Sequence, residues 1–322
     1  MQPAAIPFLD ADAIRAVVST PDLLDAVEAA YREASAGRDR SPLRSHVALD
    51  GGDLLLMPGV RAGGPGISVK LVTVMPANPD RGLPTIHAVV VWLDATTGRP
   101  AALLDGGTIT AMRTGAASGV ATRLLARPDS ATLAMIGAGG QAEWQVRGVL
   151  AARPIRRVLV HARSPEGRTA FARRMAEATG VPAEAVATAR EAVEAADVVC
   201  CATTSSEPVF DPAWVRPGTH VNGVGAFRLG MVELPPGLFA RASLVAVDSR
   251  AAARAEAGDL MAAVEQRLVA EDDLTEIGEV ERGWAERRPA DAITVFKSVG
   301  LAIQDVAAAE LAVRRLLGDA QA

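Results

Sequence analysis

Two kinds of cationic side chain stand at positions that packing alone does not explain. Arg113 and Thr114 interrupt the Ala- and Gly-rich segment DGGTITAMRTGAASG, and Lys70 and Lys297 are the two lysines among 33 basic residues. A guanidinium can grip an anionic group with two parallel hydrogen bonds, whereas an ammonium is a compact donor that can change its protonation state. The residue types alone leave open, for Arg113, a salt bridge to an acid at a helix end.

The clearest motif is the glycine turn in ATLAMIGAGGQAEWQ. Gly137, Gly139 and Ala142 form G-x-G-x-x-A directly after an apolar strand and at the start of a helix. The first glycine permits a tight turn, the second lets the backbone approach a pyrophosphate, and the small third residue lets the helix pack on the strand. The motif predicts a dinucleotide site at a helix N-terminus, with a glycine turn needed only for packing as the alternative.

The end of the second strand of this unit indicates which dinucleotide binds. NAD sites usually carry Asp or Glu there to hold the ribose hydroxyls, but this strand runs out into His161, Ala162, Arg163 and Ser164. Arg163 and the Ser164 hydroxyl can receive a 2′-phosphate through charge-assisted hydrogen bonds. The sequence therefore favours NADP(H), with NAD(H) possible. The alternative is that Arg163 only covers the following helix.

The elements that must position these residues change in rhythm along the chain. Residues 13–37 have helical periodicity, short apolar segments up to residue 105 read as strands, and DATTGRP is a turn between two of them. From about residue 129, strands and helices alternate. We predict an α/β protein: a mixed α+β domain over 1–120, a Rossmann-type doubly wound parallel sheet over 121–298, and a closing helix over 299–322 that returns to the first domain.

Composition excludes several classes of protein. The apolar fraction of 49% and the net charge of −5 are typical of a globular protein that does not bind nucleic acid. The N-terminal segment lacks the pattern of a secretory signal, and no long uncharged apolar run is present, so we expect a soluble cytoplasmic protein without a membrane partner. Adjacent Cys200 and Cys201 in an apolar run predict buried strand residues, and no metal site is expected.

Five segments, in this order, resemble the ornithine cyclodeaminase and mu-crystallin family: SVKLVTVMP, LPTIHAVVVWLDATTGRPAALLDGGTITAMRTGAASGVAT, IGAGGQA, THVNGVGAFRLGMVEL and FKSVGLAIQD. The resemblance covers nearly the whole chain. It implies that the first domain binds substrate and forms a homodimer and that the second binds NAD(P). The family includes ornithine cyclodeaminase, an alanine dehydrogenase and reductases of cyclic imino acids such as Δ1-pyrroline-2-carboxylate.

The resemblance also implies roles for individual residues. Arg44, Lys70 and Arg113 would hold the carboxylate of a small substrate, and Lys70 and Arg113 are the predicted catalytic residues. Lys70 would steady or supply the proton at an imine nitrogen. With the glycine motif and the strand end, the expected cofactor-binding residues are Thr85, Thr114, Gly137, Ala138, Gly139, Gln141, Arg163, Ser164, Thr203, Ser205, Lys297 and Ser298. The threonines can instead be ordinary strand residues, and Lys297 can be a structural partner.

One departure from the family decides between activities. In the cyclodeaminases the loop corresponding to VNGVGAFRLGMVEL carries an aspartate where this chain has Phe227. Loss of ammonia from ornithine needs a base, whereas reduction of a cyclic imine needs a fixed carboxylate and a hydride, and a phenyl ring suits an apolar substrate ring. We predict an NAD(P)H-dependent reductase of Δ1-pyrroline-2-carboxylate or Δ1-piperideine-2-carboxylate that yields proline or pipecolate. Alternatives are a cyclodeaminase, an amino acid dehydrogenase, or a non-catalytic NADPH-dependent binding protein.

Overall fold

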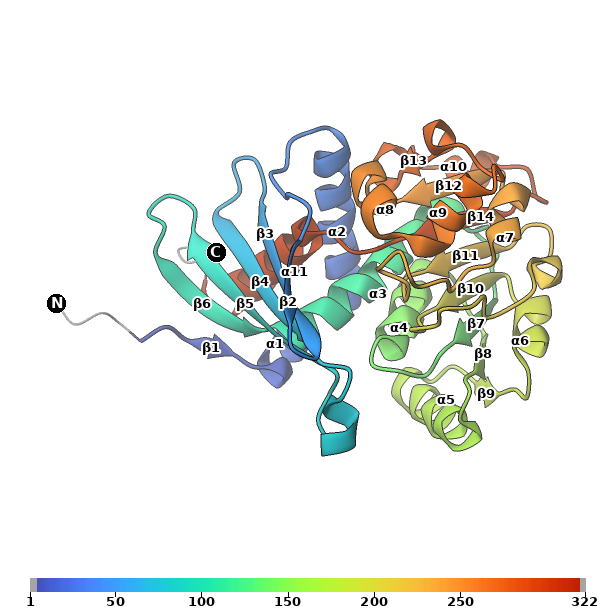
Figure 1. The fold of residues 1–322 in the computed structure, drawn as a ribbon, viewed down its shortest axis with the longest axis horizontal. Coiled ribbons are helices and arrows are strands. Elements are labelled where there is room, and N and C mark those ends of the chain that lie inside the picture. The colour runs from blue at the N-terminus through green and yellow to red at the C-terminus, as the bar shows by residue number, and fades with distance from the viewer. Residues whose placement is uncertain (1–4, 319–322) are drawn as a thin grey trace. The chain divides into compact units, whose positions relative to one another are not determined.

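In the computed structural model the chain forms two compact units (Figure 1), and the structure describes residues 5–318. Unit 1 comprises residues 1–113 and 301–322, and unit 2 comprises residues 114–300. The first division falls inside helix α3 (Gly106–Leu125), whereas the sequence placed it after residue 120. Residues 1–4 and 319–322 of the predicted domains lie outside the described residues.

Unit 1 is built on a six-stranded mixed sheet. Neighbouring strands pair antiparallel except for β1 and β6, which pair in parallel. The strands, in sheet order, are β1 (Phe8–Leu9), β6 (Pro100–Asp105), β5 (Ile86–Asp94), β4 (Gly66–Val74), β3 (Gly52–Val60) and β2 (Ser45–Leu49). Asp94 closes the predicted β5–β6 hairpin by accepting hydrogen bonds from the amides of Thr96 and Thr97, at 2.8 and 2.7 Å. The short 3₁₀ turn η1 (Asn78–Arg81) follows β4.

Helices cover one face of this sheet. The closing helix α11 (Ala302–Leu317) packs on β3, β4 and β5 and against α2 (Thr20–Ser35), as the sequence predicted for a C-terminal helix returning to the first domain. The single helix predicted over 13–37 is wrong, because α1 (Ala11–Val17) ends before α2 begins. Ser19 caps α2 by accepting a hydrogen bond from Asp22 at 3.3 Å, and Pro21 suits a first turn but not a helix interior.

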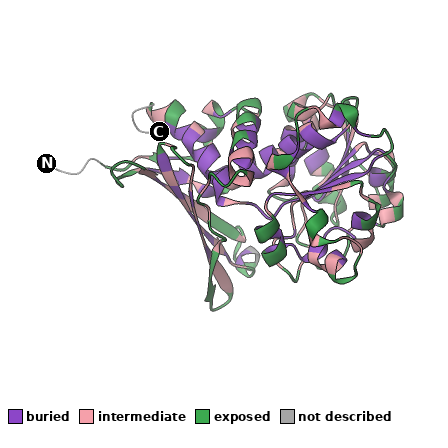
Figure 2. Ribbon diagram, turned by 90° about the horizontal axis from the view of Figure 1, so that it is seen from above, coloured by how far each residue is buried: buried purple, intermediate pink, exposed green. Residues whose placement is uncertain are grey.

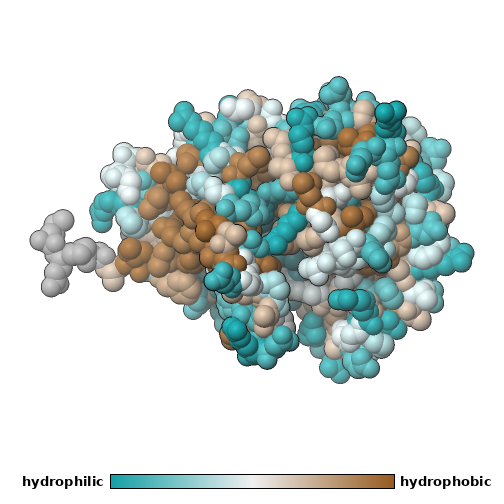
Figure 3. Space-filling view, viewed as in Figure 1, coloured by the Kyte–Doolittle hydropathy of each residue, from teal (hydrophilic) through white to brown (hydrophobic). Residues whose placement is uncertain are grey.

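The opposite face of the sheet is apolar and not fully covered. Residues alternate between buried and half-buried along β4, as a period of two requires, and the half-buried residues are apolar except for Thr73. Across three adjacent strands this set comprises Leu54, Leu56, Ile67, Val69, Leu71, Val89, Val91 and Leu93. Figure 2 shows intermediate and exposed stretches along these strands, and apolar side chains gather over the sheet in Figure 3. We call this set the apolar sheet face.

Unit 2 is a doubly wound sheet in which all eight strands are parallel. In sheet order they are β13 (Thr275–Glu276), β12 (Leu244–Val247), β14 (Thr294–Lys297), β11 (His220–Gly223), β10 (Val198–Cys201), β7 (Thr132–Ile136), β8 (Arg157–His161) and β9 (Ala183–Ala185). Strands β8 and β10 flank β7 on opposite sides, so the direction of winding reverses at β7. The crevice outside the carboxyl ends of β7 and β10 is therefore the place where such sheets bind ligands.

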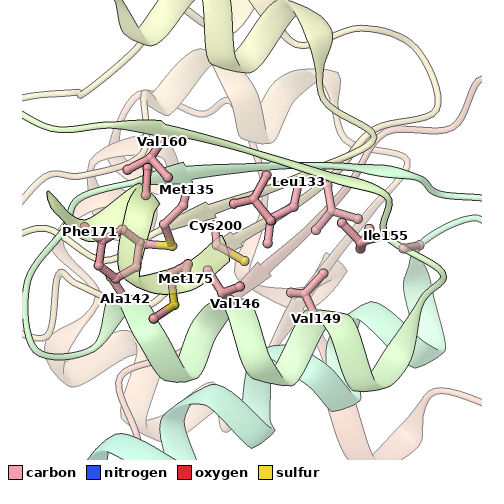
Figure 4. Close-up of a cluster of buried hydrophobic side chains, with 14 residues drawn as sticks. Leu133, Met135, Ala142, Val146, Val149, Ile155, Val160, Phe171, Met175 and Cys200 are labelled. Carbon is pink, nitrogen blue, oxygen red and sulfur yellow. The ribbon is translucent and has the colours of Figure 1, made fainter. Parts of the chain in front are cut away.

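Helices accompany this sheet, and a continuous apolar core lies beneath them. They are α4 (Ala142–Ala152), α5 (Pro165–Thr179), α6 (Ala189–Ala195), α7 (Pro236–Arg241), α8 (Arg250–Glu256), α9 (Gly258–Glu265) and α10 (Trp284–Arg287), with 3₁₀ turns η2 (Pro212–Trp214), η3 (Glu271–Asp273) and η4 (Ile277–Glu279). Figure 4 shows Val146 and Val149 of α4 directed toward the strands that carry Leu133 and Cys200. Burial raises the pKa of the Cys200 thiol to about 12, so it is an inert core residue.

Small residues bring α3 and α4 into backbone contact within unit 2. A Cβ atom added to Gly148 would overlap the carbonyl of Gly115, and one added to Gly115 would overlap the carbonyl of Trp144. The Ala- and Gly-rich composition of RTGAASG is therefore explained by this close approach. Among the described residues, no helix is long and apolar enough to cross a membrane.

This contact predicts that Gly148→Ala lowers the free energy of unfolding by about 1–3 kcal/mol or more, because the added methyl has no space between two backbones. Urea unfolding of the wild type and the variant measures the difference. Gly230→Ala is the matched control, since a Cβ there meets nothing within 4 Å, and its change should stay within about 0.5 kcal/mol. Equal stabilities of the Gly148→Ala variant and the wild type would contradict the described packing.

Candidate active site

In unit 1 two of the three predicted carboxylate-binding cations meet on a single buried acid. Lys70 extends from β4, and its Nζ lies 2.9 Å from both carboxylate oxygens of Asp305 in the first turn of α11. Arg113 extends from α3, and its Nε donates to Asp305 Oδ1 at 3.0 Å. The three side chains are 5% exposed or less. The salt bridge to a helix-end acid, left open for Arg113 by the sequence, is thus present, and it includes Lys70.

Neutral groups complete this cluster. Arg113 Nη1 donates to Gln304 Oε1 at 2.5 Å, and the same oxygen accepts the backbone N–H of Leu301 at 3.0 Å. The Gln304 amide donates to the Tyr31 hydroxyl of α2. The guanidinium is therefore oriented by two residues of α11, one charged and one neutral.

The surroundings of Lys70 bring the pKa of its amine close to neutral pH. Burial lowers the pKa of Lys70 to about 7; Asp305 opposes this change, while Arg113 and the half-buried Arg44 add to it. Arg44, which precedes β2, acts on Lys70 through its charge. An amine with a pKa near 7 can both attract an anion and donate a proton at physiological pH.

In unit 2 the glycine turn has the geometry that the motif predicts. Gly137 has φ of +105°, and a Cβ there would lie 2.8 Å from the carbonyl oxygen of Ala202 after β10. Gly139 faces open space, with nothing within 4 Å of an added Cβ. Ala142 is fully buried in the core, where α4 starts. The open N-terminus of α4 at the carboxyl end of β7 fits a pyrophosphate, and Ala138 and Gln141 belong to the same turn.

Two basic residues, Arg163 and Arg168, and one acidic residue, Glu166, follow the end of β8. Arg163 and Ser164 are exposed, and Ser164 caps α5 by accepting the backbone N–H of Gly167 at 3.0 Å. The Ser164 hydroxyl donates to Glu166 at 3.1 Å, and Arg168 donates to the Ala162 carbonyl at 3.1 Å. Ser164 therefore already has a structural role, whereas no hydrogen bond among the described residues engages the exposed Arg163 side chain.

The loops after β10 and β11 are tied together by a buried glutamate that the sequence analysis missed. Glu233 is fully buried, and its carboxylate accepts the backbone N–H of Thr203 and, at 2.8 Å, that of Gly225. Burial raises the pKa of Glu233, while Lys297 and the two backbone donors oppose this. Ser205 lies in the same stretch, and its carbonyl accepts the Val232 amide at 3.1 Å.

Phe227 lies on this loop and is half-buried. The Arg228 guanidinium stands over its ring, 5.4 Å from the centroid. Glu233 is the one carboxylate between residues 224 and 233, and both of its oxygens are engaged by backbone amides. The loop thus offers an aromatic ring and no available base.

Lys297 and Ser298, at the end of β14, serve internal contacts in this structure. The Lys297 amine is fully buried, donates to the Ala226 carbonyl at 2.6 Å and lies 3.2 Å from Asp259. The Ser298 hydroxyl donates to Asp248 at 2.8 Å. Lys297 therefore fixes the Phe227 loop from beneath, which is the structural alternative stated above. Their predicted contact with the cofactor stays a prediction.

The remaining predicted residues divide between the units. Thr85 is half-buried before β5 in unit 1, and its carbonyl accepts the Met75 amide at 2.7 Å. Thr114 is buried in α3, in unit 2. In the part of the chain that the structure describes, no three His, Cys, Asp or Glu side chains gather as metal ligands.

The functional partners that the sequence did not reveal are all buried acids or amides. Asp305 and Gln304 lie in FKSVGLAIQD, and Glu233 lies in VNGVGAFRLGMVEL, both of which were noted only as segments. The signal that could have revealed them is a polar residue within an apolar helical or strand pattern. Such a residue is buried, and a buried charge requires a partner.

Comparison with known proteins places these features in a family. The family model described as the ornithine cyclodeaminase/mu-crystallin family matches residues 8–319. The Δ1-pyrroline-2-carboxylate reductase of Bacillus cereus is 40% identical over 319 residues, covering 97% of this chain and 98% of that protein.

Two solved structures share the whole architecture. The Δ1-pyrroline-2-carboxylate reductase of Thermococcus litoralis, in complex with NADH and L-proline, has a TM-score of 0.91 at 36% identity, covering 97% of this chain and 98% of that one. An archaeal alanine dehydrogenase dimer with bound NAD has a TM-score of 0.88 at 31% identity, covering 98% and 97%. The predicted fold class is confirmed.

Proposed function

The chain belongs to the ornithine cyclodeaminase/mu-crystallin family, and we propose that it is an NAD(P)H-dependent reductase of a small cyclic imine carboxylate. Its substrate is Δ1-pyrroline-2-carboxylate or Δ1-piperideine-2-carboxylate, and its product is L-proline or L-pipecolate. The observation that carries this proposal is the buried pair of cations, Lys70 and Arg113, opposite one carboxylate of the chain. A relative of the same fold has been solved with NADH and L-proline.

The charge balance of the cluster favours a carboxylate ligand. Lys70 and Arg113 carry two positive charges against the single negative charge of Asp305, and Arg44 adds a third cation nearby. Buried charges need compensation, and an incoming carboxylate supplies it. Holding the carboxylate fixes the adjacent imine carbon, which is the atom that must be reduced.

Reduction of the imine requires a hydride at carbon and a proton at nitrogen. A reduced nicotinamide dinucleotide, when bound at the Gly137–Gly139 turn, supplies the hydride. Lys70 supplies the proton: its N–H bond breaks as the ring N–H bond forms, and its pKa of about 7 suits the transfer near neutral pH. Arg113 holds the carboxylate, and Phe227 packs against the apolar ring.

The loop that carries Phe227 argues against the cyclodeaminase alternative. Loss of ammonia from ornithine needs a base near the amine. Glu233, the carboxylate in this loop, is buried and accepts two backbone hydrogen bonds, so it does not replace an acid at position 227.

We propose NADP(H) as the preferred form of the cofactor. The three residues after β8 include no acid, and Arg163 is exposed there, where it can bind a 2′-phosphate. Relatives solved with NADH or NAD show that the family also accepts the unphosphorylated form.

We further propose a homodimer in which the apolar sheet face is covered by a second copy. Val47 and Leu49 of the edge strand β2 continue this face and are 43% and 41% exposed. An apolar surface of this kind is typical of protein interfaces, and the archaeal alanine dehydrogenase relative is a dimer.

The activity is tested by following oxidation of NADPH and NADH with each of the two cyclic imines. We expect imine-dependent turnover, and no ammonia from ornithine with NAD. In the same assay Arg113→Ala should lower kcat/KM by about ten- to a hundred-fold, because a hydrogen bond to a charged group contributes about 1.5–3 kcal/mol. Exposed Arg99→Ala is the control and should act like the wild type. Ammonia from ornithine without imine reduction would overturn the proposal.

The cofactor preference predicts that Arg163→Ala weakens NADPH binding by about 1.5–3 kcal/mol, through loss of a charged hydrogen bond, and leaves NADH binding nearly unchanged. Fluorescence titration of both cofactors gives the two dissociation constants. Arg173→Ala, exposed on α5, removes an equal charge away from the strand end and should change neither. Equal weakening of NADPH and NADH by Arg163→Ala would refute the 2′-phosphate assignment.

The proposed interface predicts that Val47→Glu converts the dimer to a monomer, because it places a charge in a buried apolar contact. Light scattering during size-exclusion chromatography measures the mass. Thr97→Glu, in the exposed β5–β6 turn, adds the same charge and should remain dimeric. A wild-type protein with the mass of one chain would rule the interface out.

A further inference from the structure

The acid at the start of α11 stands where it controls both reactive cations at once. Asp305 is 0% exposed, and its carboxylate lies within 3.0 Å of Lys70 Nζ and of Arg113 Nε. It lies in the first turn of a sixteen-residue helix, where the helix dipole favours a negative charge. The proposed reaction itself does not require Asp305. The carboxylate that Lys70 and Arg113 bind during the reaction belongs to the substrate.

Without Asp305 the buried Lys70 amine would have only the positive charges of Arg113 and Arg44 near it. Burial, Arg113 and Arg44 all favour the neutral amine, and Asp305 is the group that favours the ammonium. The charged and titratable groups near the amine are Asp305 on α11, Arg113 on α3 and Arg44 before β2. From α2, the Tyr31 hydroxyl reaches the cluster through Gln304.

We propose that Asp305 is a positioning residue that holds the Lys70 amine and the Arg113 guanidinium on one carboxylate and keeps Lys70 charged until the imine nitrogen takes its proton. The proposal rests on the proposed reductase function. It assigns Asp305 no contact with the substrate.

The arrangement also explains how the cluster tolerates loss of that proton. When Lys70 gives its proton to the ring nitrogen, the remaining pair of Asp305 and Arg113 is neutral. With the product still bound, its carboxylate and Asp305 face the guanidiniums of Arg113 and Arg44, so the cluster holds two charges of each sign and no costly unpaired charge. The amine regains its proton from solvent after the product leaves.

Two lysines in the whole chain make the test direct. Protein labelled with lysine carrying ¹³C at the ε position gives two side-chain signals, and Lys70→Arg identifies that of Lys70. In Asp305→Asn we expect the Lys70 signal to titrate roughly one to three pH units lower than in the wild type, because an adjacent opposite charge has been removed. Glu310→Gln, on the same helix and paired with Arg61, is the matched control and should leave Lys70 unchanged.

Kinetics separate positioning from a merely structural effect. Lys70 must be protonated to act, so kcat/KM falls as pH rises through its pKa; in Asp305→Asn this fall should move to lower pH by the same amount as the NMR signal. A lower kcat/KM with an unchanged pH profile would mean a structural role and would overturn the proposal.

Asp305→Glu decides the matter if the Asn variant does not fold, because it keeps the charge. Lys70 should then titrate at or above its wild-type pH, with reduced kcat/KM because the carboxylate has moved. A Glu variant in which Lys70 titrates below the wild type would also overturn the proposal. If the wild type reduces no cyclic imine, the reductase proposal fails, and the NMR titrations still test whether Asp305 keeps Lys70 charged.

Discussion

One buried carboxylate, shared by an ammonium and a guanidinium, is the interaction on which the rest of unit 1 depends. Asp305 joins β4, α3 and α11, three elements that are far apart in the sequence. Each of these charges would be costly in an apolar interior by itself, and each is tolerable because the other two are there. The closing helix must therefore return to the sheet of the first unit for the cations to be usable at all.

A second buried acid plays the corresponding part in unit 2. Glu233 fixes the loops after β10 and β11 through backbone amides, and Lys297 holds the second loop through the Ala226 carbonyl. The charged side chains of Glu233 and Lys297 thus fix the backbone of these loops, and Phe227 is the side chain that the second loop presents. In both units, buried charged side chains fix the positions of the surrounding groups. In unit 1 these are the two cations, and in unit 2 they are the two loops.

Local patterns allowed much of this to be predicted from the sequence. The glycine turn after β7, the β5–β6 hairpin and the closing helix each have a signal within a few adjacent residues. The break between α1 and α2 also had one, in Ser19 and Pro21, but the apolar periodicity continues across it. The pairing of Lys70 and Arg113 on Asp305 spans 235 and 192 residues, and no spacing rule reaches so far. Strands of two or three residues, such as β9 and β13, are too short for any pattern.

The burial of both lysines and both cysteines gives the surface an unusual chemical character. Lys70 is 1% exposed, and Lys297, Cys200 and Cys201 are 0% exposed, so the side-chain cations that meet solvent are guanidiniums. Crosslinkers, dyes and surface-coupling reagents that target ε-amines or thiols therefore find no side chain to modify on the outside of the folded protein. A reagent small enough to reach Lys70 would have to enter the cluster of Lys70, Arg113 and Asp305. Acylation of this protein would therefore report whether that cluster is already occupied by a ligand.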